Sequence, residues 1–328
     1  MKILITGGLG VNGSWVTREA IRRGHDVTVI DVRDDFSLMT ANERAGLDFV
    51  LLDAGDLDKT AALMRERRIE AVIHMAAAVG SQKPEPDPYL VYKINTDLTA
   101  RLLEASRLAN VRRFVFSSSR AVYGPIAGEY QAPFYRPVSE DHPLLPGKLY
   151  DMCKVASEWI GSEFAASYAM EFVALRYAMI FGPGKTVRHG KFGTVSRMIE
   201  DAAAGVPVRI DVGGDQKDDM IFAEDVGTGT LLAVEAPKLN HTVYNICNGV
   251  GHTLNDVAAA IRAEIPGAEI AVGNGLNFLG TDANYSGILD PARAIADLGY
   301  MPRTDLRDCV RRYLAAIDHT GLLARHAS

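Results

Sequence analysis

The feature that most constrains this chain is a glycine-rich segment that directly follows its first apolar run. Residues 2–6 read as a buried strand, and Gly7, Gly10 and Gly13 follow at intervals of three before a helical pattern begins. Glycines at this spacing allow a tight turn and a close approach of the backbone to a diphosphate. The free N–H groups at the start of the helix favour negative charge. The segment therefore predicts a strand–turn–helix unit that binds a dinucleotide, a structural turn being the alternative.

An acidic residue at the end of the second predicted strand supports the dinucleotide interpretation. Asp31 lies 18 residues after Gly13. A carboxylate in this place accepts hydrogen bonds from both ribose hydroxyls of an adenosine and repels a 2′-phosphate, which favours NAD over NADP. Arg33 could soften that preference. We expect NAD as the cofactor, held in this part of the chain by Gly7, Gly10, Val11, Asn12, Gly13 and Asp31.

Short apolar runs alternate with helical patterns through the first half of the chain. Buried strands separated by helices imply right-handed crossovers and a parallel, doubly wound sheet. The predicted strands are residues 2–6, 26–30, 49–52, 71–74, 113–117 and 172–176, and the predicted helices include 15–23, 98–109 and 151–168. We expect a dinucleotide-binding domain with the catalytic residues over 1–181. A smaller, loop-rich substrate-binding region over 182–328 is expected to be partly interleaved with it.

Composition argues against several classes of partner. The 328 residues carry a formal net charge of -6, which disfavours nucleic acid. No apolar run is long enough to span a bilayer, and the start of the chain has no signal-peptide pattern. The three cysteines, Cys153, Cys247 and Cys309, lie far apart and suggest neither a metal site nor disulfides. We expect a cytoplasmic protein that binds a small molecule and no metal.

Three polar residues stand where such a sheet carries out chemistry. Tyr150 and Lys154 are four residues apart at the start of a helical stretch, so they share one helix face. Ser119 follows the predicted strand 113–117, at the edge of the sheet where ligands bind. An ordinary amphipathic helix with an exposed lysine is the plain alternative.

Together these motifs resemble the extended short-chain dehydrogenases/reductases of the NAD-dependent epimerase/dehydratase family. The resemblance covers nearly the whole chain and implies a Rossmann-type doubly wound sheet and an enzyme that transfers a hydride to NAD. It rests on the glycine turn, Asp31, residues 72–77, Asn95, residues 117–124, 150–154, 175–177, 182–183, 289–290 and 298–302.

The resemblance also implies roles for single residues. Tyr150 would act as general base or acid at the reacting oxygen, Lys154 would lower its pKa and hold the nicotinamide ribose, and Ser119 would polarise the substrate oxygen. Lowering the tyrosine pKa from about 10 to about 7 takes roughly 4 kcal/mol. Further cofactor contacts are implied for Asp53, Ala54, Met75, Ala76, Ala77, Asn95, Ser117, Tyr150, Lys154 and Tyr177, with Asn95 expected to brace the sheet.

Two positions depart from the relatives that act on nucleotide-sugars. Met179 stands where these have a substrate-facing asparagine, and Asp218 stands where an arginine holds the substrate diphosphate. A poorly screened aspartate would repel a diphosphate by roughly a few kcal/mol, unless a basic residue such as Arg188 compensates. We therefore expect a compact substrate pocket that contains Ser119, Tyr150, Met179, Arg188 and Asp218.

Three functions remain open at this point. The first is a dehydrogenase that oxidises a secondary alcohol of a small polyhydroxylated or hydroxy-acid substrate, with Tyr150 as general base; Met179 and Asp218 favour it. The second is a nucleotide-sugar 4-epimerase that keeps NAD tightly bound. The third is a non-catalytic NAD-sensing protein, which the presence of Tyr150 and Lys154 disfavours. The resemblance further implies a homodimer, formed by the helix that carries Tyr150 and the helix after the fourth strand. The candidate contact residues, which could equally belong to the core, are Leu98, Leu102, Leu103, Trp159 and Ile160.

Overall fold

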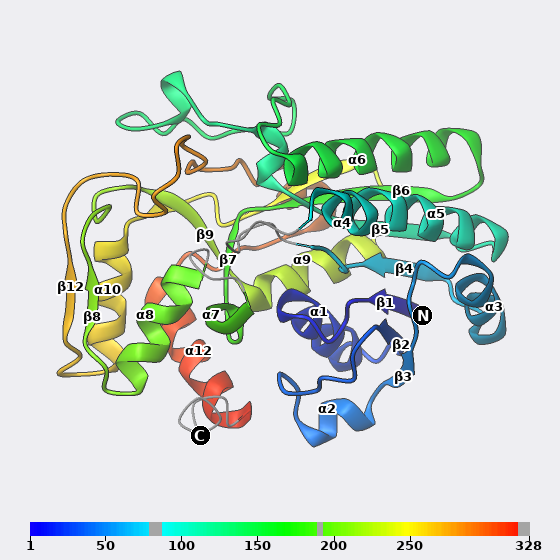
Figure 1. The fold of residues 1–328 in the computed structure, drawn as a ribbon, viewed down its shortest axis with the longest axis horizontal. Helices are drawn as coiled ribbons and strands as arrows, with labels where there is room; N and C mark the ends of the chain where they lie inside the picture. The colour runs from blue at the N-terminus through cyan, green and yellow to red at the C-terminus, as the bar shows by residue number, and fades with distance from the viewer. Residues whose placement is uncertain (79–86, 189–192, 321–328) are drawn as a thin grey trace.

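A parallel sheet of seven strands lies at the centre of the computed structural model, which describes residues 1–78, 87–188 and 193–320 (Figure 1). The strand order is β10-β6-β5-β4-β1-β2-β3, so the direction of winding reverses between β4 and β1. The predicted doubly wound sheet is confirmed. The strands are β1 (Lys2–Thr6), β2 (Asp26–Asp31), β3 (Asp48–Leu51), β4 (Ala71–His74), β5 (Arg113–Ser119), β6 (Glu171–Tyr177) and β10 (Val243–Ile246).

Helices cover both faces of this sheet because its strands are apolar on both sides. Ile3 and Ile5 of β1 pack in one core with α1 (Val11–Arg22) and α9 (Ala223–Glu235), whereas Leu4 packs in a second core on the opposite face. The second core includes α3 (Leu57–Arg67) and α5 (Leu98–Leu108), and α6 (Leu149–Ser167) packs beside α5. Among the described residues, no helix combines the length and the apolar character needed to cross a membrane.

Shorter elements complete this half of the molecule. They are α2 (Ala41–Ala45), α4 (Pro88–Tyr92), the π-helical turn η1 (Lys93–Asp97), and the 3-10 turns η2 (Arg120–Tyr123) and η3 (Gly128–Tyr130).

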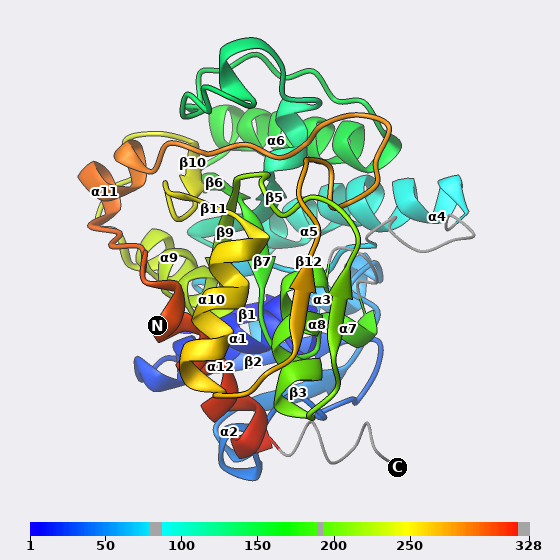
Figure 2. The same ribbon diagram turned by 90° about the vertical axis from the view of Figure 1, so that its left-hand side faces the viewer.

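A second group of elements lies to one side of the sheet, at the left of Figure 1 and facing the viewer in Figure 2. A three-stranded sheet contains β7 (Met179–Phe181), β9 (Asp218–Phe222) and β11 (Gly251–His252), and a two-stranded sheet contains β8 (Val208–Ile210) and β12 (Ile270–Val272). The helices here are α7 (Lys185–Arg188), α8 (Thr194–Ala203), α10 (Leu254–Glu264) and α12 (Leu306–Thr320), whereas α11 (Ala292–Leu298) packs against β10 and α9.

Two elements from beyond residue 181 return to the central sheet. Strand β10 pairs in parallel with β6, and α9 packs against α1. These contacts of β10 and α9 join the two groups of elements. The domain boundary between residues 181 and 182 stays a prediction.

A buried arginine fastens α9 to the sheet. The side chain of Arg113, the first residue of β5, is completely buried, and its Nη1 donates to the carbonyl oxygens of Ala233, Val234 and Ala236 at distances of 2.6–2.9 Å. Its Nε and Nη2 donate to Glu171. Carbonyl groups in the last turn of a helix lack intrahelical partners and carry partial negative charge, so a cation there both satisfies and stabilises them.

We expect Arg113→Lys to lower the free energy of unfolding by about 2–4 kcal/mol, because an ammonium group cannot reach the three carbonyls and Glu171 together. The matched control is Arg112→Lys. Arg112 donates to the same Glu171 but is half exposed, so its replacement should cost less than about 0.5 kcal/mol. Urea denaturation of the two variants measures the difference, and equal losses would contradict the assigned role of Arg113.

Candidate functional site

The glycine turn between β1 and α1 leaves no room for side chains. Gly7 has a φ of 65°, and its carbonyl accepts the N–H of Gly10 at 3.0 Å. A Cβ on Gly13 would lie 2.0 Å from the Gly7 oxygen, and a Cβ on Gly7 would lie 2.8 Å from the backbone of Ala76. The backbone of the turn is therefore bare, as close contact with a ligand requires.

The start of α1 offers hydrogen-bond donors to an anion. Gly10 precedes the helix without a side-chain cap, and its first turn has no acidic residue. The N–H groups of Val11, Asn12 and Gly13 have no intrahelical acceptor, because Ser14 is the first residue to donate back to Gly10. The Oδ1 atom of Asn12 is buried without a partner. The three free N–H groups of the first turn fit the diphosphate of a dinucleotide.

The neighbouring strand ends supply the other predicted cofactor residues. At the end of β2, Oδ1 of Asp31 accepts the N–H groups of Val32 and Arg33. After β3, Asp53 accepts the N–H of Gly55 and Ala54 is buried. After β4, the N–H of Met75 donates to the carbonyl of Thr6 at 3.1 Å, Ala76 lies beside Gly7, and Ala77 is exposed. The carboxylate of Asp31 fits the ribose of an adenosine, and the small side chain of Ala76 beside the glycine turn leaves room for a diphosphate.

Two of the predicted cofactor residues have side chains that are committed elsewhere. Asn95 is buried in η1, where its Nδ2 donates to the carbonyls of Ala78 and Val91 and its Oδ1 accepts the N–H of Ala78. It therefore holds the backbone that follows β4. The hydroxyl of Tyr177 is buried 2.7 Å from Thr230 Oγ1 on α9. A contact between Tyr177 and NAD would have to come from its backbone.

Helix α6 brings Tyr150 and Lys154 to the end of β5. Lys154 Nζ donates to the carbonyl of Ser117 at 2.6 Å and lies 5.6 Å from the centre of the Tyr150 ring. Tyr150 is hydrogen-bonded to Ser119, and Ser119 Oγ also accepts the N–H of Ala121 at 3.2 Å. The three residues singled out in the sequence thus form one cluster at the carboxyl edge of the sheet.

Burial acts on both titratable groups of this cluster. It raises the pKa of Tyr150 above its usual value, and the Asp151 carboxylate raises it further, against the effect of the Ser119 hydrogen bond. Burial lowers the pKa of Lys154 to about 8. Without cofactor, the tyrosine is therefore a neutral hydroxyl. Positive charge from Lys154 and from an oxidised nicotinamide ring would have to stabilise its deprotonated form.

A buried network that the sequence analysis missed fixes α6 against the sheet. Glu158, one turn after Lys154, accepts hydrogen bonds from Ser118 Oγ at 2.5 Å and from Arg176 Nη2 at 2.7 Å. Arg176 also donates to the hydroxyl of Tyr123 and to the carbonyl of Glu140. The available signal was an arginine within the apolar run of β6, since a buried charge requires a partner.

The aspartate at position 218 does not face the site as an unpaired charge. Asp218 is completely buried at the start of β9, and the guanidinium of Arg120 binds both of its carboxylate oxygens. Its carboxylate also accepts from Ser286 Oγ and from the N–H groups of Gly287 and Asp219. Asp218 therefore neutralises and holds Arg120, which follows Ser119 directly in the chain.

Two other predicted substrate residues have different outcomes. Met179 is buried in β7, in register with Met220 of β9. The side chain of Arg188 lies outside the described part of the structure. Their predicted contacts with substrate, like those of Ser119, Tyr150 and Asp218, stay predictions.

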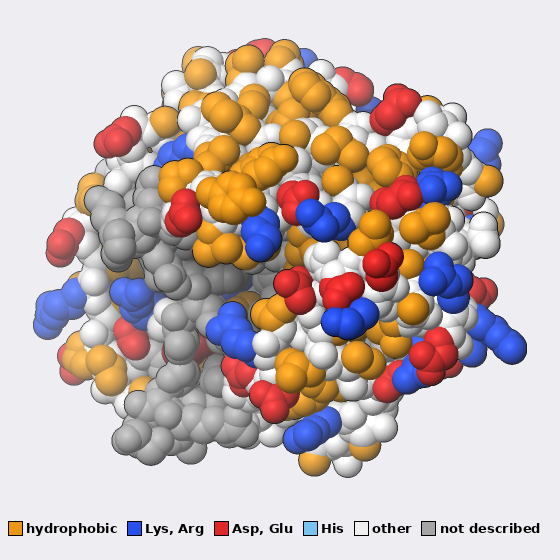
Figure 3. Space-filling model, turned by 45° about the vertical axis from the view of Figure 1, so that its right-hand side comes forward, with side chains coloured by type: hydrophobic (Ala, Val, Ile, Leu, Met, Phe, Trp, Pro, Cys, Tyr) orange, Lys and Arg blue, Asp and Glu red, His pale blue; other side chains and the backbone are white. Residues whose placement is uncertain are grey.

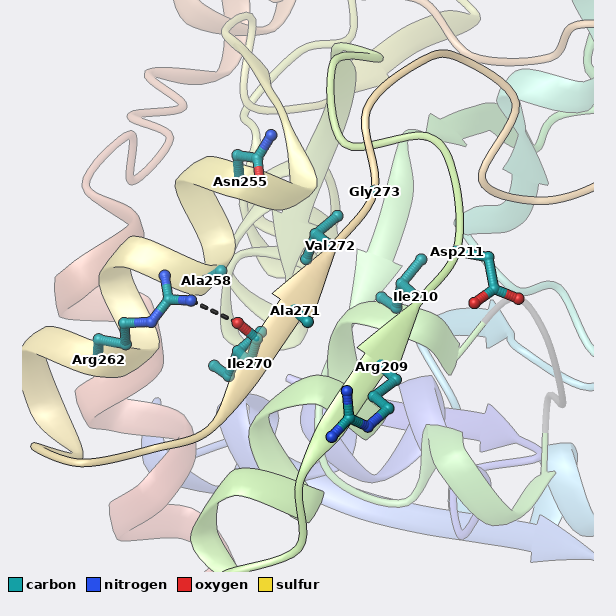
Figure 4. A pocket seen from close by; sticks show the side chains of 10 residues that line it. All are labelled: Arg209, Ile210, Asp211, Asn255, Ala258, Arg262, Ile270, Ala271, Val272 and Gly273. Atoms are coloured by element: carbon teal, nitrogen blue, oxygen red, sulfur yellow. Dashed lines mark hydrogen bonds between the residues drawn. The ribbon is translucent and has the colours of Figure 1, made fainter.

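An open cavity of about 490 Å³ lies elsewhere, between β8, β12 and α10 (Figure 4). Arg262 donates to the carbonyl of Ile270 on one side of this cavity, while Asp211 points away from it. None of the predicted site residues lines it. Within the ranges that the structure describes, no group of three His, Cys, Asp or Glu residues could hold a metal ion.

The pKa of Lys154 leads to a prediction about stability. The folded pKa of about 8 lies below the unfolded value of 10.5, so between these pH values the unfolded chain holds a proton that the folded chain lacks. The unfolding free energy of the wild type should therefore rise with pH relative to that of Lys154→Met, by up to about 3 kcal/mol. Urea denaturation of both proteins at pH 7 and pH 10 measures this. A pH-independent difference would contradict the lowered pKa.

Comparisons with known proteins agree with this geometry. The sequence model of the NAD dependent epimerase/dehydratase family matches residues 3–247. The UDP-glucose 4-epimerase of Corynebacterium glutamicum is 29% identical, over 94% of both chains. The crystal structure of Thermus thermophilus UDP-glucose 4-epimerase with NAD is 28% identical with a TM-score of 0.79, over 98% of this chain and 99% of that one.

A third similar structure is MoeE5 in complex with UDP-glucuronic acid and NAD. It is 28% identical with a TM-score of 0.77, over 98% of this chain and all of the other. The family match, the bare glycine turn and the Ser119–Tyr150–Lys154 cluster lead to one conclusion. The chain belongs to the NAD-dependent epimerase/dehydratase family and is an NAD-dependent enzyme of the extended short-chain dehydrogenase/reductase type.

Proposed function

We propose that the protein is a nucleotide-sugar 4-epimerase that keeps NAD bound through the turnover. The observation that carries the proposal is the pairing of Arg120 with Asp218. The sequence argument against a nucleotide-sugar was repulsion between Asp218 and a diphosphate, and a carboxylate already bound by a guanidinium no longer exerts that repulsion. The similarity to UDP-glucose 4-epimerases along the chain then supports the epimerase over the small-molecule dehydrogenase.

In this proposal, the side chains of Ser119, Tyr150 and Lys154 act on the C4 hydroxyl of the sugar. The phenolate oxygen of deprotonated Tyr150 takes the proton of the C4 hydroxyl and later returns it, while Ser119 donates a hydrogen bond to the same oxygen. The ammonium of Lys154, buried beside the Tyr150 ring, stabilises the tyrosinate. Bound NAD would supply the acceptor that takes up and gives back a hydride.

The NAD-loaded protein should interconvert UDP-glucose and UDP-galactose without net formation of NADH. Proton NMR of the sugar signals measures inversion, and absorbance of the reaction mixture measures NADH. Inversion without NADH is the expected result, because each hydride removed from the sugar returns to it. Stoichiometric NADH release without inversion would instead support the dehydrogenase, the second candidate, which the apolar Met179 favours.

Tyr150→Phe should lower turnover by about 10²–10⁴-fold, since it removes the proton acceptor and leaves the ring in place. NAD affinity and thermal stability should stay close to the wild-type values. Tyr168→Phe, which removes an exposed hydroxyl just past the other end of α6, is the matched control and should keep full turnover. Turnover in the Tyr150 variant equal to that of the control would contradict the assigned role.

We further propose that the protein forms a homodimer through α4 and α6. Trp159 and Tyr89 are about two-thirds exposed, and Leu90, Tyr92 and Met152 are also exposed. A broad run of hydrophobic side chains crosses the upper half of the molecule in Figure 3, the height at which Figure 1 has α4 and α6. A large exposed apolar patch is typical of an interface. By contrast, Leu98, Leu102 and Leu103 belong to the core.

A further inference from the structure

Arg120 is bonded differently from Arg113 and Arg176, which are more deeply buried. Arg113 and Arg176 each use Nε, Nη1 and Nη2 to bind protein acceptors. Within the described ranges, Arg120 binds a single partner, Asp218, through Nη1 and Nη2. A guanidinium has five N–H donors, so three of them remain for another acceptor.

Arg120 lies at the edge of the sheet that holds Ser119, Tyr150 and Lys154. It follows Ser119 at the end of β5, and Asp218 holds it from the start of β9, so the pair bridges the sheet edge and the second group of elements. The Arg120 side chain keeps 12% of its surface exposed, while Asp218 has none. Arg120 is therefore the member of the pair that a ligand at this edge of the sheet can reach.

A second buried basic side chain, that of Lys185, is close enough to Arg120 for the two charges to repel each other. Lys185, at the start of α7, is 7% exposed. Burial lowers its pKa to about 7, and repulsion by the Arg120 charge contributes to the shift. Of the two aspartates at the start of β9, Asp219 binds the N–H groups of Asn248, Gly249 and Leu289 instead of a cation. Among the described residues, Asp218 is the one carboxylate that binds Arg120, and the N–H donors left on this guanidinium favour an anionic ligand.

We propose that Arg120, oriented by Asp218, is a specificity-determining residue that binds an oxyanion of the substrate beside Ser119. The oxyanion belongs either to the diphosphate or to a carboxylate on the sugar. The inference rests on the proposed function, because both groups are parts of a nucleotide-sugar. It explains why an arginine next to the catalytic serine and an aspartate on β9 occur together in this chain.

The test uses the full-length NAD-loaded protein and the double variant R120Q/D218N, which removes both charges and leaves no unpaired buried ion. Calorimetry measures the dissociation constants of UDP and of uridine. If Arg120 binds the diphosphate, the preference for UDP over uridine falls by about ten- to a hundredfold in the variant. The matched control E129Q/R136Q removes an exposed pair from the following loop and should keep the preference.

A second arm addresses the sugar carboxylate. The ratio of kcat/KM for UDP-glucuronic acid to that for UDP-glucose is measured in the wild type and the variant. If Arg120 binds a carboxylate, the wild type favours UDP-glucuronic acid and the variant loses that preference. If R120Q/D218N does not fold, R120K replaces it; a point charge retains attraction but loses the planar donor pair, so each preference should fall partway.

The inference is overturned if a folded variant with normal NAD affinity changes neither preference, or if the wild type shows neither. The UDP and uridine measurements need no turnover, so they separate this inference from the proposed function. Loss of the UDP preference in a protein that inverts no nucleotide-sugar would support the site and refute the epimerase. Inversion of a nucleotide-sugar, with the ligand preferences of the variant unchanged, would support the epimerase and refute the Arg120 site.

Discussion

The buried pair of Glu158 and Arg176 sets the position of helix α6. Glu158 lies on α6 one turn after Lys154, and Arg176 lies on β6, so their hydrogen bonds at 2.7 and 3.0 Å fix α6 against the sheet. Ser118 joins the pair from β5. A charge removed from water in this way requires its partner to stay in place, because breaking such a pair costs about 3–5 kcal/mol. The distances among Ser119, Tyr150 and Lys154 depend on this constraint.

The central sheet could be predicted because its information is local. Apolar runs and glycine positions identify β1 to β6 within one or two residues of the observed ends. Helix α1 begins at Val11, four residues before the predicted start, since Asn12, Gly13 and Ser14 are weak helix formers that the turn and the sheet hold in place. Strand β10 was not predicted, because four residues have little periodicity and their pairing with β6 is a tertiary fact.

In the candidate site, too, features with a local sequence signal could be predicted, and contacts between distant residues could not. The glycine turn and Asp31 follow from spacing, and the roles of Ser119, Tyr150 and Lys154 follow from a family resemblance. The ion pairs Glu158–Arg176 and Arg120–Asp218 were not predicted, because their partners are 18 and 98 residues apart in the sequence. Read alone, Asp218 suggested repulsion of a diphosphate. In the fold, Asp218 binds the guanidinium of Arg120, so its negative charge is neutralised. The sign of a local charge is a property of the folded cluster, which no single position in a sequence reveals.

The return of α9 and β10 to the central sheet has a consequence for how the chain can be divided. A fragment that ended at residue 181 would leave the hydrogen-bonding edge of β6 open and the packing face of α1 uncovered. An open edge of this kind pairs readily with other chains. During synthesis, the part of the chain that carries Ser119, Tyr150 and Lys154 must therefore wait for residues 223–246 before its sheet is complete. The first two-thirds of the whole chain would therefore behave as an aggregation-prone intermediate. They would not form a domain that can be moved into another protein.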